Sequence, residues 1–167
     1  MKKSLVLGLL TFSVFSAGTA LPQQTNPSAS AKLETIFQAA EMPFVKLGAD
    51  HYKAVVSIDT NESDSFQVFL QTIGNDPNDV DLQIMQMVFF LGELPKGAAP
   101  PNALVKQINE WNSNLSRGSV FILEGVILYQ SSAWLSKSDA TTLTNDALVG
   151  HFTSQKLRKE VELYLKQ

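Results

Sequence analysis

The spacing of apolar residues predicts two kinds of element in the first half of the chain. A first helix is expected where apolar residues recur every three or four positions, at Leu33, Ile36, Phe37 and Ala40. After Met42-Pro43 the pattern changes to apolar runs separated by polar turns, which is typical of strands. We expect these strands at residues 44–47, 52–58, 65–73 and 81–91, with the first two forming a hairpin.

A second helix is predicted after the proline-containing segment 95–101. Pro101 suits the first turn of a helix, because its missing N–H has no partner to lose there. One face of this helix should be apolar, through Leu104, Ile108, Trp111 and Leu115. Asn112 and Asn114 favour the end of the helix, since asparagine bonds readily to nearby backbone.

Two more strands, 120–123 and 126–135, are expected to form a second hairpin. Glycine at the Glu124-Gly125 turn can adopt the positive φ that such a turn requires. The predicted fold class is therefore α+β, an antiparallel sheet with helices packed on it, in the order α-β-β-β(-β)-α-β-β-α.

The C-terminal segment, residues 138–167, is predicted to be helical with a break. Leu148, Val149 and Phe152 mark one face, and Leu157, Val161 and Leu165 mark another. The two faces lie roughly 140 to 180° apart at 100° per residue, so one straight helix cannot bury both. We expect the break at Gly150 or Thr153, with Thr153 as the cap of the last segment.

The N-terminus is predicted to direct export. Lys2 and Lys3 precede an apolar run and a small-residue segment that ends at Ala20, the pattern of a cleaved secretory signal peptide. Residues 1–20 are thus expected to be a signal peptide, 21–30 a flexible linker, and 31–167 a single domain in the periplasm or outside the cell. The run is too short for a membrane span, so none is expected after cleavage.

Composition narrows the function classes. Without residues 1–20 the chain would keep 11 basic and 16 acidic residues, and this acidity argues against nucleic-acid binding. The absence of cysteine excludes thiol catalysis and zinc sites built on thiolates. With 44% hydrophobic residues, a domain without disulfides can be held together by packing alone.

A short motif at the end of the second helix suggests a family. The motif Asn109-Glu110-Trp111-Asn112, followed by Arg117 and a strand, resembles the YbjN family over most of residues 31–165. The resemblance implies a domain similar to type III secretion chaperones and a role in bacterial sensory transduction, with no catalytic residues to carry over. From the residues themselves, Trp111 should pack in the core with its indole N–H on a carbonyl, and Asn109 and Asn112 should bond backbone; a ligand pocket is the alternative.

The residue types of catalytic and metal sites occur, but not in recognisable motifs. His51 and His151 lie at no motif spacing to a serine or an acid, so surface or capping roles are expected and no catalytic or cofactor-binding residue is assigned. Calcium is weighed as an alternative because oxygen ligands crowd two loops. These ligands are Asp59, Asn61, Glu62 and Asp64 in one loop, and Asp76, Asn78, Asp79 and Asp81 in the other. Both loops lack the glycine and final glutamate of an EF-hand.

The expected function rests on the two strands predicted at 65–73 and 81–91. In these strands apolar residues occupy both sets of alternate positions, which we call the two parities, so both faces of each strand contain apolar side chains. One parity should face the helices, through Phe66, Val68 and Leu70 with Leu82, Ile84, Val88 and Phe90. The other parity contains Phe69, Met85, Met87 and Phe89, which are the candidate partner-binding residues. Either the last helix covers this second face, or part of it stays open for a partner.

The sequence therefore predicts an exported, non-catalytic binding or chaperone-like module that engages a protein or peptide. A structural homodimer is the first alternative. A hydrolase with an unrecognised site is the second.

Overall fold

The computed structural model describes residues 27–58, 63–76 and 79–166. The helices are α1 (Ala29–Ala39), α2 (Asn102–Asn114) and α3 (Ala140–Leu165), and two short 3₁₀ turns are η1 (Val80–Leu82) and η2 (Leu135–Lys137). The strands are β1 (Phe44–Lys46), β2 (His51–Ser57), β3 (Ser63–Thr72), β4 (Gln83–Glu93), β5 (Ser119–Leu123) and β6 (Val126–Trp134). The predicted α+β class and element order are confirmed.

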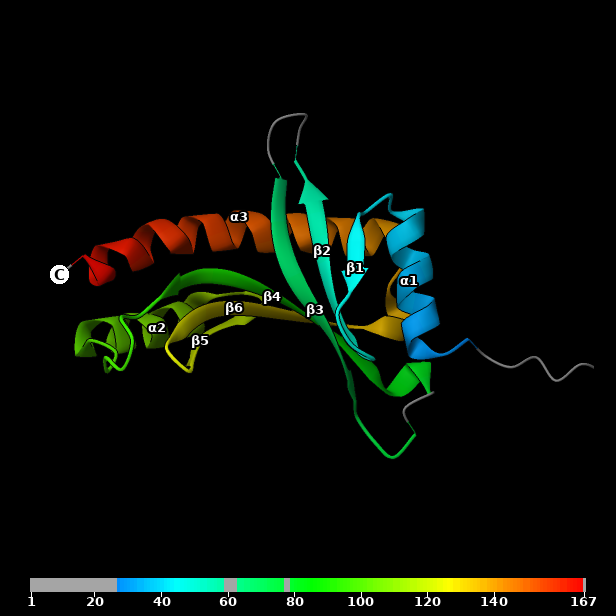
Figure 1. Cartoon of the computed structure of the whole chain (residues 1–167), viewed down its shortest axis with the longest axis horizontal. Helices are drawn as coiled ribbons and strands as arrows, with labels where there is room; N and C mark the ends of the chain where they lie inside the picture. Colours follow the sequence, from blue (N-terminus) through cyan, green and yellow to red (C-terminus); the bar gives the residue numbers. More distant parts are fainter. Residues whose placement is uncertain (1–26, 59–62, 77–78, 167) are drawn as a thin grey trace, which may run out of the picture.

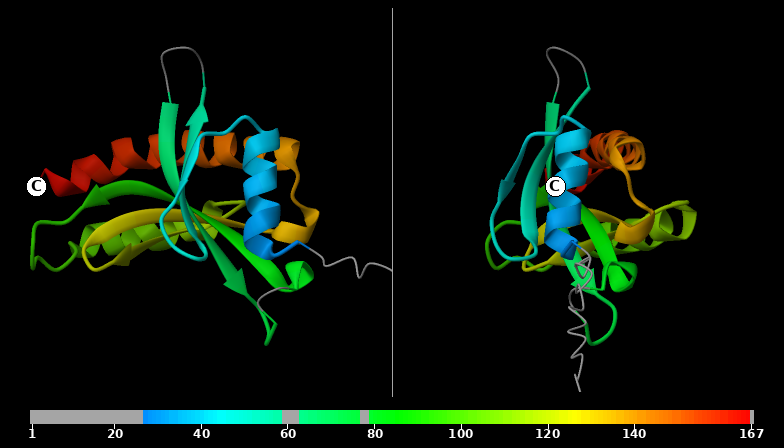
Figure 2. Two further views of the ribbon diagram at one scale, coloured as in Figure 1. Left: turned by 45° about the vertical axis from the view of Figure 1, so that its right-hand side comes forward. Right: turned by 90° about the vertical axis from the view of Figure 1, so that its right-hand side faces the viewer.

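The six strands form one antiparallel sheet in the order β1-β2-β3-β4-β6-β5. The sheet is strongly twisted, and α3 runs across it as the longest helix (Figure 1). The three helices lie on the same side of the sheet, with α2 beside the end of α3 and α1 beside its beginning (Figure 2). We call the helix-covered side of the sheet the inner face and the opposite side the outer face.

The N-terminal boundary differs slightly from the prediction. The expected signal peptide, 1–20, and most of the expected linker, 21–30, lie outside the described residues. Helix α1 begins at Ala29 because the Ser28 hydroxyl accepts a hydrogen bond from the Ala31 N–H at 3.2 Å and caps the helix. Helix α1 thus begins two residues before residue 31, where the domain was predicted to start.

The second hairpin forms as predicted. Glu124 and Gly125 both have positive φ, 51° and 87°, the conformation of a tight two-residue turn that suits the twist of the flanking strands. This turn fixes the pairing of β5 with β6, from Leu123 opposite Val126 to Ser119 opposite Gln130.

The core lies between the inner face and the three helices. Phe89 in β4 stacks on Phe66 in β3 with ring centroids 5.1 Å apart, and its ring is tilted against Tyr129 in β6 at 6.1 Å. At the other end, Phe37 of α1 packs on Phe44 at 4.9 Å and on Tyr52 at 5.8 Å. One aromatic cluster therefore joins the central strands β3, β4 and β6 on the inner face, and a second one fastens α1 to the sheet.

The predicted break in the last helix is wrong, because α3 is continuous over 26 residues. The prediction took Val149 and Phe152 to be core residues, but their side chains are 46% and 56% exposed. The buried stripe instead follows small and polar residues through the middle of the helix: Leu143, Ala147, Gly150, His151, Ser154, Leu157 and Val161. A single straight stripe exists, and hydrophobicity alone does not mark its central part.

At Gly150 the backbone of α3 lies close against the sheet. A Cβ atom at this position would lie 2.3 Å and 2.4 Å from two ring atoms of Phe89. Glycine is therefore used here for close packing and not for flexibility. Over the part of the chain that the structure describes, no helix is both long and apolar enough to span a bilayer.

Candidate functional site

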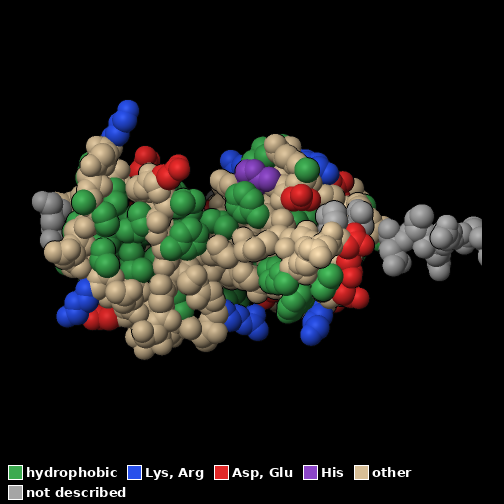
Figure 3. Space-filling model, turned by 90° about the horizontal axis from the view of Figure 1, so that it is seen from below, with side chains coloured by type: hydrophobic (Ala, Val, Ile, Leu, Met, Phe, Trp, Pro, Cys, Tyr) green, Lys and Arg blue, Asp and Glu red, His purple; other side chains and the backbone are tan. Residues whose placement is uncertain are grey.

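The outer face is the side of the sheet that the helices leave uncovered. Its side chains come from alternate positions of the strands, and those of β3, β4 and β6 form the centre of the sheet. In β3 to β6 they are Ser65, Gln67, Phe69, Gln71, Ile84, Gln86, Val88, Phe90, Ser119, Phe121, Leu123, Leu128, Gln130, Ser132 and Trp134. Seen from below, hydrophobic side chains gather in groups on the surface (Figure 3).

Several of these apolar side chains are substantially exposed. Leu123 is 58%, Phe90 51% and Trp134 41% accessible to solvent. A groove of about 440 Å³ lies between Phe90, Leu123 and β3, with Val88, Phe90 and Leu128 on its apolar wall, whereas Trp134 lies at the other end of β6, opposite Ile84. Its polar lining consists of Lys53, Ser65, Gln67 and Glu124.

The structure divides the predicted partner-binding residues between the two faces. Phe69 lies on the outer face, where its ring stacks on that of His51 at 4.2 Å. Met85, Met87 and Phe89 are buried in the core, with at most 1% of each side chain exposed. The idea that these three residues form an open surface is therefore wrong.

Strand register explains this correction. Val68 lies opposite Met87 and Leu70 lies opposite Met85, so each pair points to the same, inner face. The prediction placed the inward residues of β3 on the same face as three residues of β4 that in fact point outward. These three are Ile84, Val88 and Phe90. Both parities of β4 are apolar, so the sequence pattern allowed either register.

The motif residues of α2 make structural contacts. The indole N–H of Trp111 donates to the Glu160 carboxylate in α3 at 2.9 Å, where a carbonyl was expected. The Asn112 amide pairs with Val120 in β5 in both directions, accepting from its N–H at 2.7 Å and donating to its carbonyl at 2.8 Å. Asn112 thus ties α2 to the edge strand much as another strand would.

The remaining motif residues are at the surface. Asn109 and Glu110 are exposed on α2. The contacts of Trp111 and Asn112 anchor the helix, and not the backbone contact that was expected for the Asn109 side chain. Arg117 forms an ion pair with Asp146 in α3 at 2.9 Å. Trp111 also borders a cavity of about 400 Å³ between α2 and α3, together with Leu115, Phe152 and other residues, so the pocket alternative keeps a physical basis.

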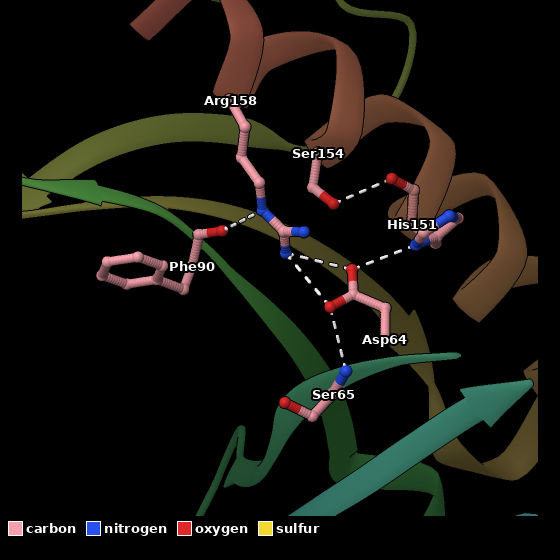
Figure 4. Close-up of polar contacts among 6 residues, drawn as sticks. All are labelled: Asp64, Ser65, Phe90, His151, Ser154 and Arg158. Atoms are coloured by element: carbon pink, nitrogen blue, oxygen red, sulfur yellow. Dashed lines mark hydrogen bonds and ion pairs between the residues drawn. The ribbon is translucent and has the colours of Figure 1, made fainter. Parts of the chain in front are cut away.

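A buried polar cluster was missed by the sequence reasoning. Asp64 at the start of β3 accepts hydrogen bonds from His151 Nδ1 at 3.0 Å and from the Arg158 guanidinium at 3.0 and 3.2 Å (Figure 4). Arg158 also donates to the Phe90 carbonyl at 2.7 Å, and the Ser65 N–H donates to Asp64. The cluster connects α3 to β3 and β4.

The cluster corrects the surface role expected for His151, which is only 3% exposed. Asp64 and His151 are 87 residues apart in the sequence, so no short motif could have linked the two side chains. The nearby Ser154 hydroxyl donates to the His151 main-chain carbonyl at 2.8 Å and not to the imidazole. The geometry is therefore that of a structural ion-pair network, without a serine positioned for attack.

The other sequence candidates lie apart. His51 begins β2 and contacts Gln67 through Nε2 at 2.8 Å. Asp79 caps the turn η1 by accepting from the Asp81 N–H, while Asp59, Asn61, Glu62 and Asn78 fall outside the described residues. Within the described ranges, no cluster of three or more histidine or acidic side chains is arranged to hold a metal ion.

Comparison with known proteins adds no family to this picture. A search against protein-family models found no match, and a search of curated proteins found none either.

Proposed function

We propose that this chain is an exported, non-catalytic binding module that holds a protein partner on the outer face of its sheet. The observation that carries the proposal is the uncovered apolar surface around the outer-face groove, where Phe90 and Leu123 are exposed. Large exposed apolar patches are uncommon on monomers and mark interaction sites. The export part of the proposal rests on the signal-like pattern of residues 1–20.

The polar residues of the outer face also suit an interface. Most of them are uncharged amides and hydroxyls, among them Gln67, Gln71, Gln86 and Gln130. The centres of protein interfaces are depleted in charge, and side-chain amides can both donate to and accept from a partner's backbone. A binding surface of this composition has little charge to desolvate.

Two opposite charges, on Lys53 and Glu124, give the partner surface a chemical character. Lys53 lines the groove, and among the described residues it has no ion-pair partner. Glu124 lines the same groove, so a partner surface that is mainly apolar and carries one acidic and one basic side chain would complement it. The partner that we propose is therefore a different protein with such a surface.

The test is to replace outer-face residues and measure binding and mass. The variant Phe90→Ser with Leu123→Ser should lose crosslinking to the partner from the native envelope, while its thermal unfolding stays close to that of the wild type. Leu163→Ser is the matched control, because Leu163 is equally exposed, 63%, but lies on α3. Sedimentation equilibrium decides the occupant: a wild-type dimer that the double variant dissociates would replace our proposal by the homodimer. Equal crosslinking of both variants would refute a role for the outer face.

The YbjN resemblance fits this proposal without carrying it. A chaperone-like domain would use an apolar sheet surface to hold another polypeptide, as proposed for the outer face. The residues replaced in the crosslinking test are therefore chosen from the exposed apolar surface and not from the family motif.

A further inference from the structure

Part of strand β6 has a neighbouring strand on one side only. Pairing with β5 ends where Ser119 lies opposite Gln130, whereas pairing with β4 continues to Ile84 opposite Trp134. Residues 131–134 of β6 therefore form an open edge in the part of the chain that the structure describes. An open edge is a template for another strand, and proteins commonly cover it.

Hydrogen-bond alternation identifies the residue whose backbone faces this edge. The Leu70 N–H bonds to the Asp50 carbonyl, so Leu70 faces β2 and its neighbour Gln71 faces β4. Gln71 lies opposite Ile84, so the next residue of β4, Met85, faces β6 and its partner Ala133 faces β4. Ser132 consequently directs its N–H and C=O to the open edge.

The backbone before β5 turns away and leaves this edge uncovered. Gly118 has φ +77°, and a Cβ there would lie 2.3 Å from the Gln130 carbonyl oxygen. The Tyr129 hydroxyl donates to the Arg117 carbonyl at 3.0 Å and holds the turn in place. The side chain of Arg117 then reaches to Asp146 on α3 and forms an ion pair with it.

Two adjoining cavities follow the open edge. One, of about 410 Å³, reaches inward to Met87 and Val149, and the other, of about 340 Å³, extends past Trp134 to Lys137. Both are lined by Arg117, Ala133 and Asp146, so they form one groove between β6 and α3. The buried hydroxyl of Ser131, which has no hydrogen-bond partner among the described residues, lines the inner cavity.

We propose that this groove binds an extended peptide segment of another protein, which adds a strand to the open edge of β6. Ser132 would supply backbone hydrogen bonds, and alternate side chains of the segment would enter the two cavities, as in other cases of strand addition. Arg117 and Lys137 outnumber Asp146 along the groove, so the segment carries an acidic side chain. The site is separate from the outer-face groove and does not depend on the function proposed for it.

The test uses a display library of short random peptides as the probe. Peptides selected on the wild-type protein should share an acidic residue among apolar ones, and their affinity is measured by fluorescence anisotropy. Ser132→Pro removes the edge N–H, which a strand edge tolerates, and should weaken binding about tenfold or more. Ser132→Ala removes the hydroxyl and keeps the N–H, so it separates the side-chain contribution from that of the backbone.

A second measurement keeps the proposal falsifiable if Ser132→Pro disturbs folding. N-methylation of the selected peptide at alternate positions should abolish binding in one register and leave it intact in the other, because only alternate N–H groups face β6. Failure to select any peptide, or equal binding of every N-methylated form, would overturn the proposal. Binding lost in the Phe90→Ser, Leu123→Ser variant but kept by Ser132→Pro would also overturn it and assign the peptide to the outer face.

Discussion

Replacing Gly150 by alanine tests the packing of α3 on the sheet. If Gly150 were a flexible point in the helix, alanine would stabilise the protein by about 1 kcal/mol, the difference in helix propensity. In the structure the new methyl group would meet the Phe89 ring at 2.3 and 2.4 Å, far inside van der Waals contact. The two readings thus predict opposite signs for one substitution.

The surroundings of Phe89 decide the magnitude. Its ring is fully buried, stacked on Phe66 and tilted against Tyr129, so it has no free space to move into. Overpacking of a dense core costs about 1–3 kcal/mol and sometimes more, and contacts this short belong at the upper end. After the propensity gain is subtracted, we expect a net loss of about 2 kcal/mol, or about 4–8 °C in Tm.

Urea unfolding followed by circular dichroism measures this loss. Asn145→Ala on the exposed side of α3 is the control, and it should stabilise the protein slightly through propensity alone. Combining Gly150→Ala with Phe89→Leu should cost less than the two single changes added together, because the smaller side chain makes room for the methyl group. A gain in stability for Gly150→Ala, or strict additivity with Phe89→Leu, would refute the close-packing argument.

Three further predictions concern other parts of the fold. Asn112→Ala should lower the free energy of unfolding by about 1–2 kcal/mol, because both of its hydrogen bonds to Val120 are lost. Asn109→Ala on the same helix should change it by less than about 0.5 kcal/mol. Equal effects of the two substitutions in urea unfolding would contradict the strand-like role of Asn112. Phe89→Ser should cost about 3–5 kcal/mol and Phe90→Ser far less, because only the second side chain faces outward; similar losses would contradict the strand register. The Lys46 and Tyr52 hydrogen bonds hold the pKa of Glu34 below its ordinary value of 4.5, so its contribution is present above that value and is lost as the pH falls through the lowered pKa. The Tm difference between wild type and Glu34→Gln should therefore be largest near neutral pH and disappear in acid, and a pH-independent difference would show that the contacts have no electrostatic part.

The local elements of this protein follow from patterns among residues close together in its sequence. Apolar spacing located the helices and strands, and Glu124-Gly125 predicted the turn between β5 and β6 because a positive φ is a local requirement. The apolar stripe of α2 likewise placed Trp111 in the core, since a helical stripe is set by residues within a few turns. These features depend on interactions between near neighbours in the chain.

Tertiary structure decided which faces meet. In β4 both parities are apolar, so only the pairing with β3 showed that Met85, Met87 and Phe89 point inward and Val88 and Phe90 outward. Phe69 points outward, as predicted. The β4 residues that were predicted to share its face, Met85, Met87 and Phe89, point inward, and Phe69 lies opposite Gln86 instead.

The central part of α3 illustrates the same limit. Gly150, His151 and Ser154 are buried because the sheet leaves no room for larger side chains at Gly150 and supplies an acid, Asp64, for His151. Neither reason is visible in the helix sequence, whose larger apolar residues Val149 and Phe152 point to solvent. A hydrophobic pattern records what a side chain prefers, whereas burial depends on the shape and charge of what packs against it, and here those come from strands about 60–90 residues away in the chain.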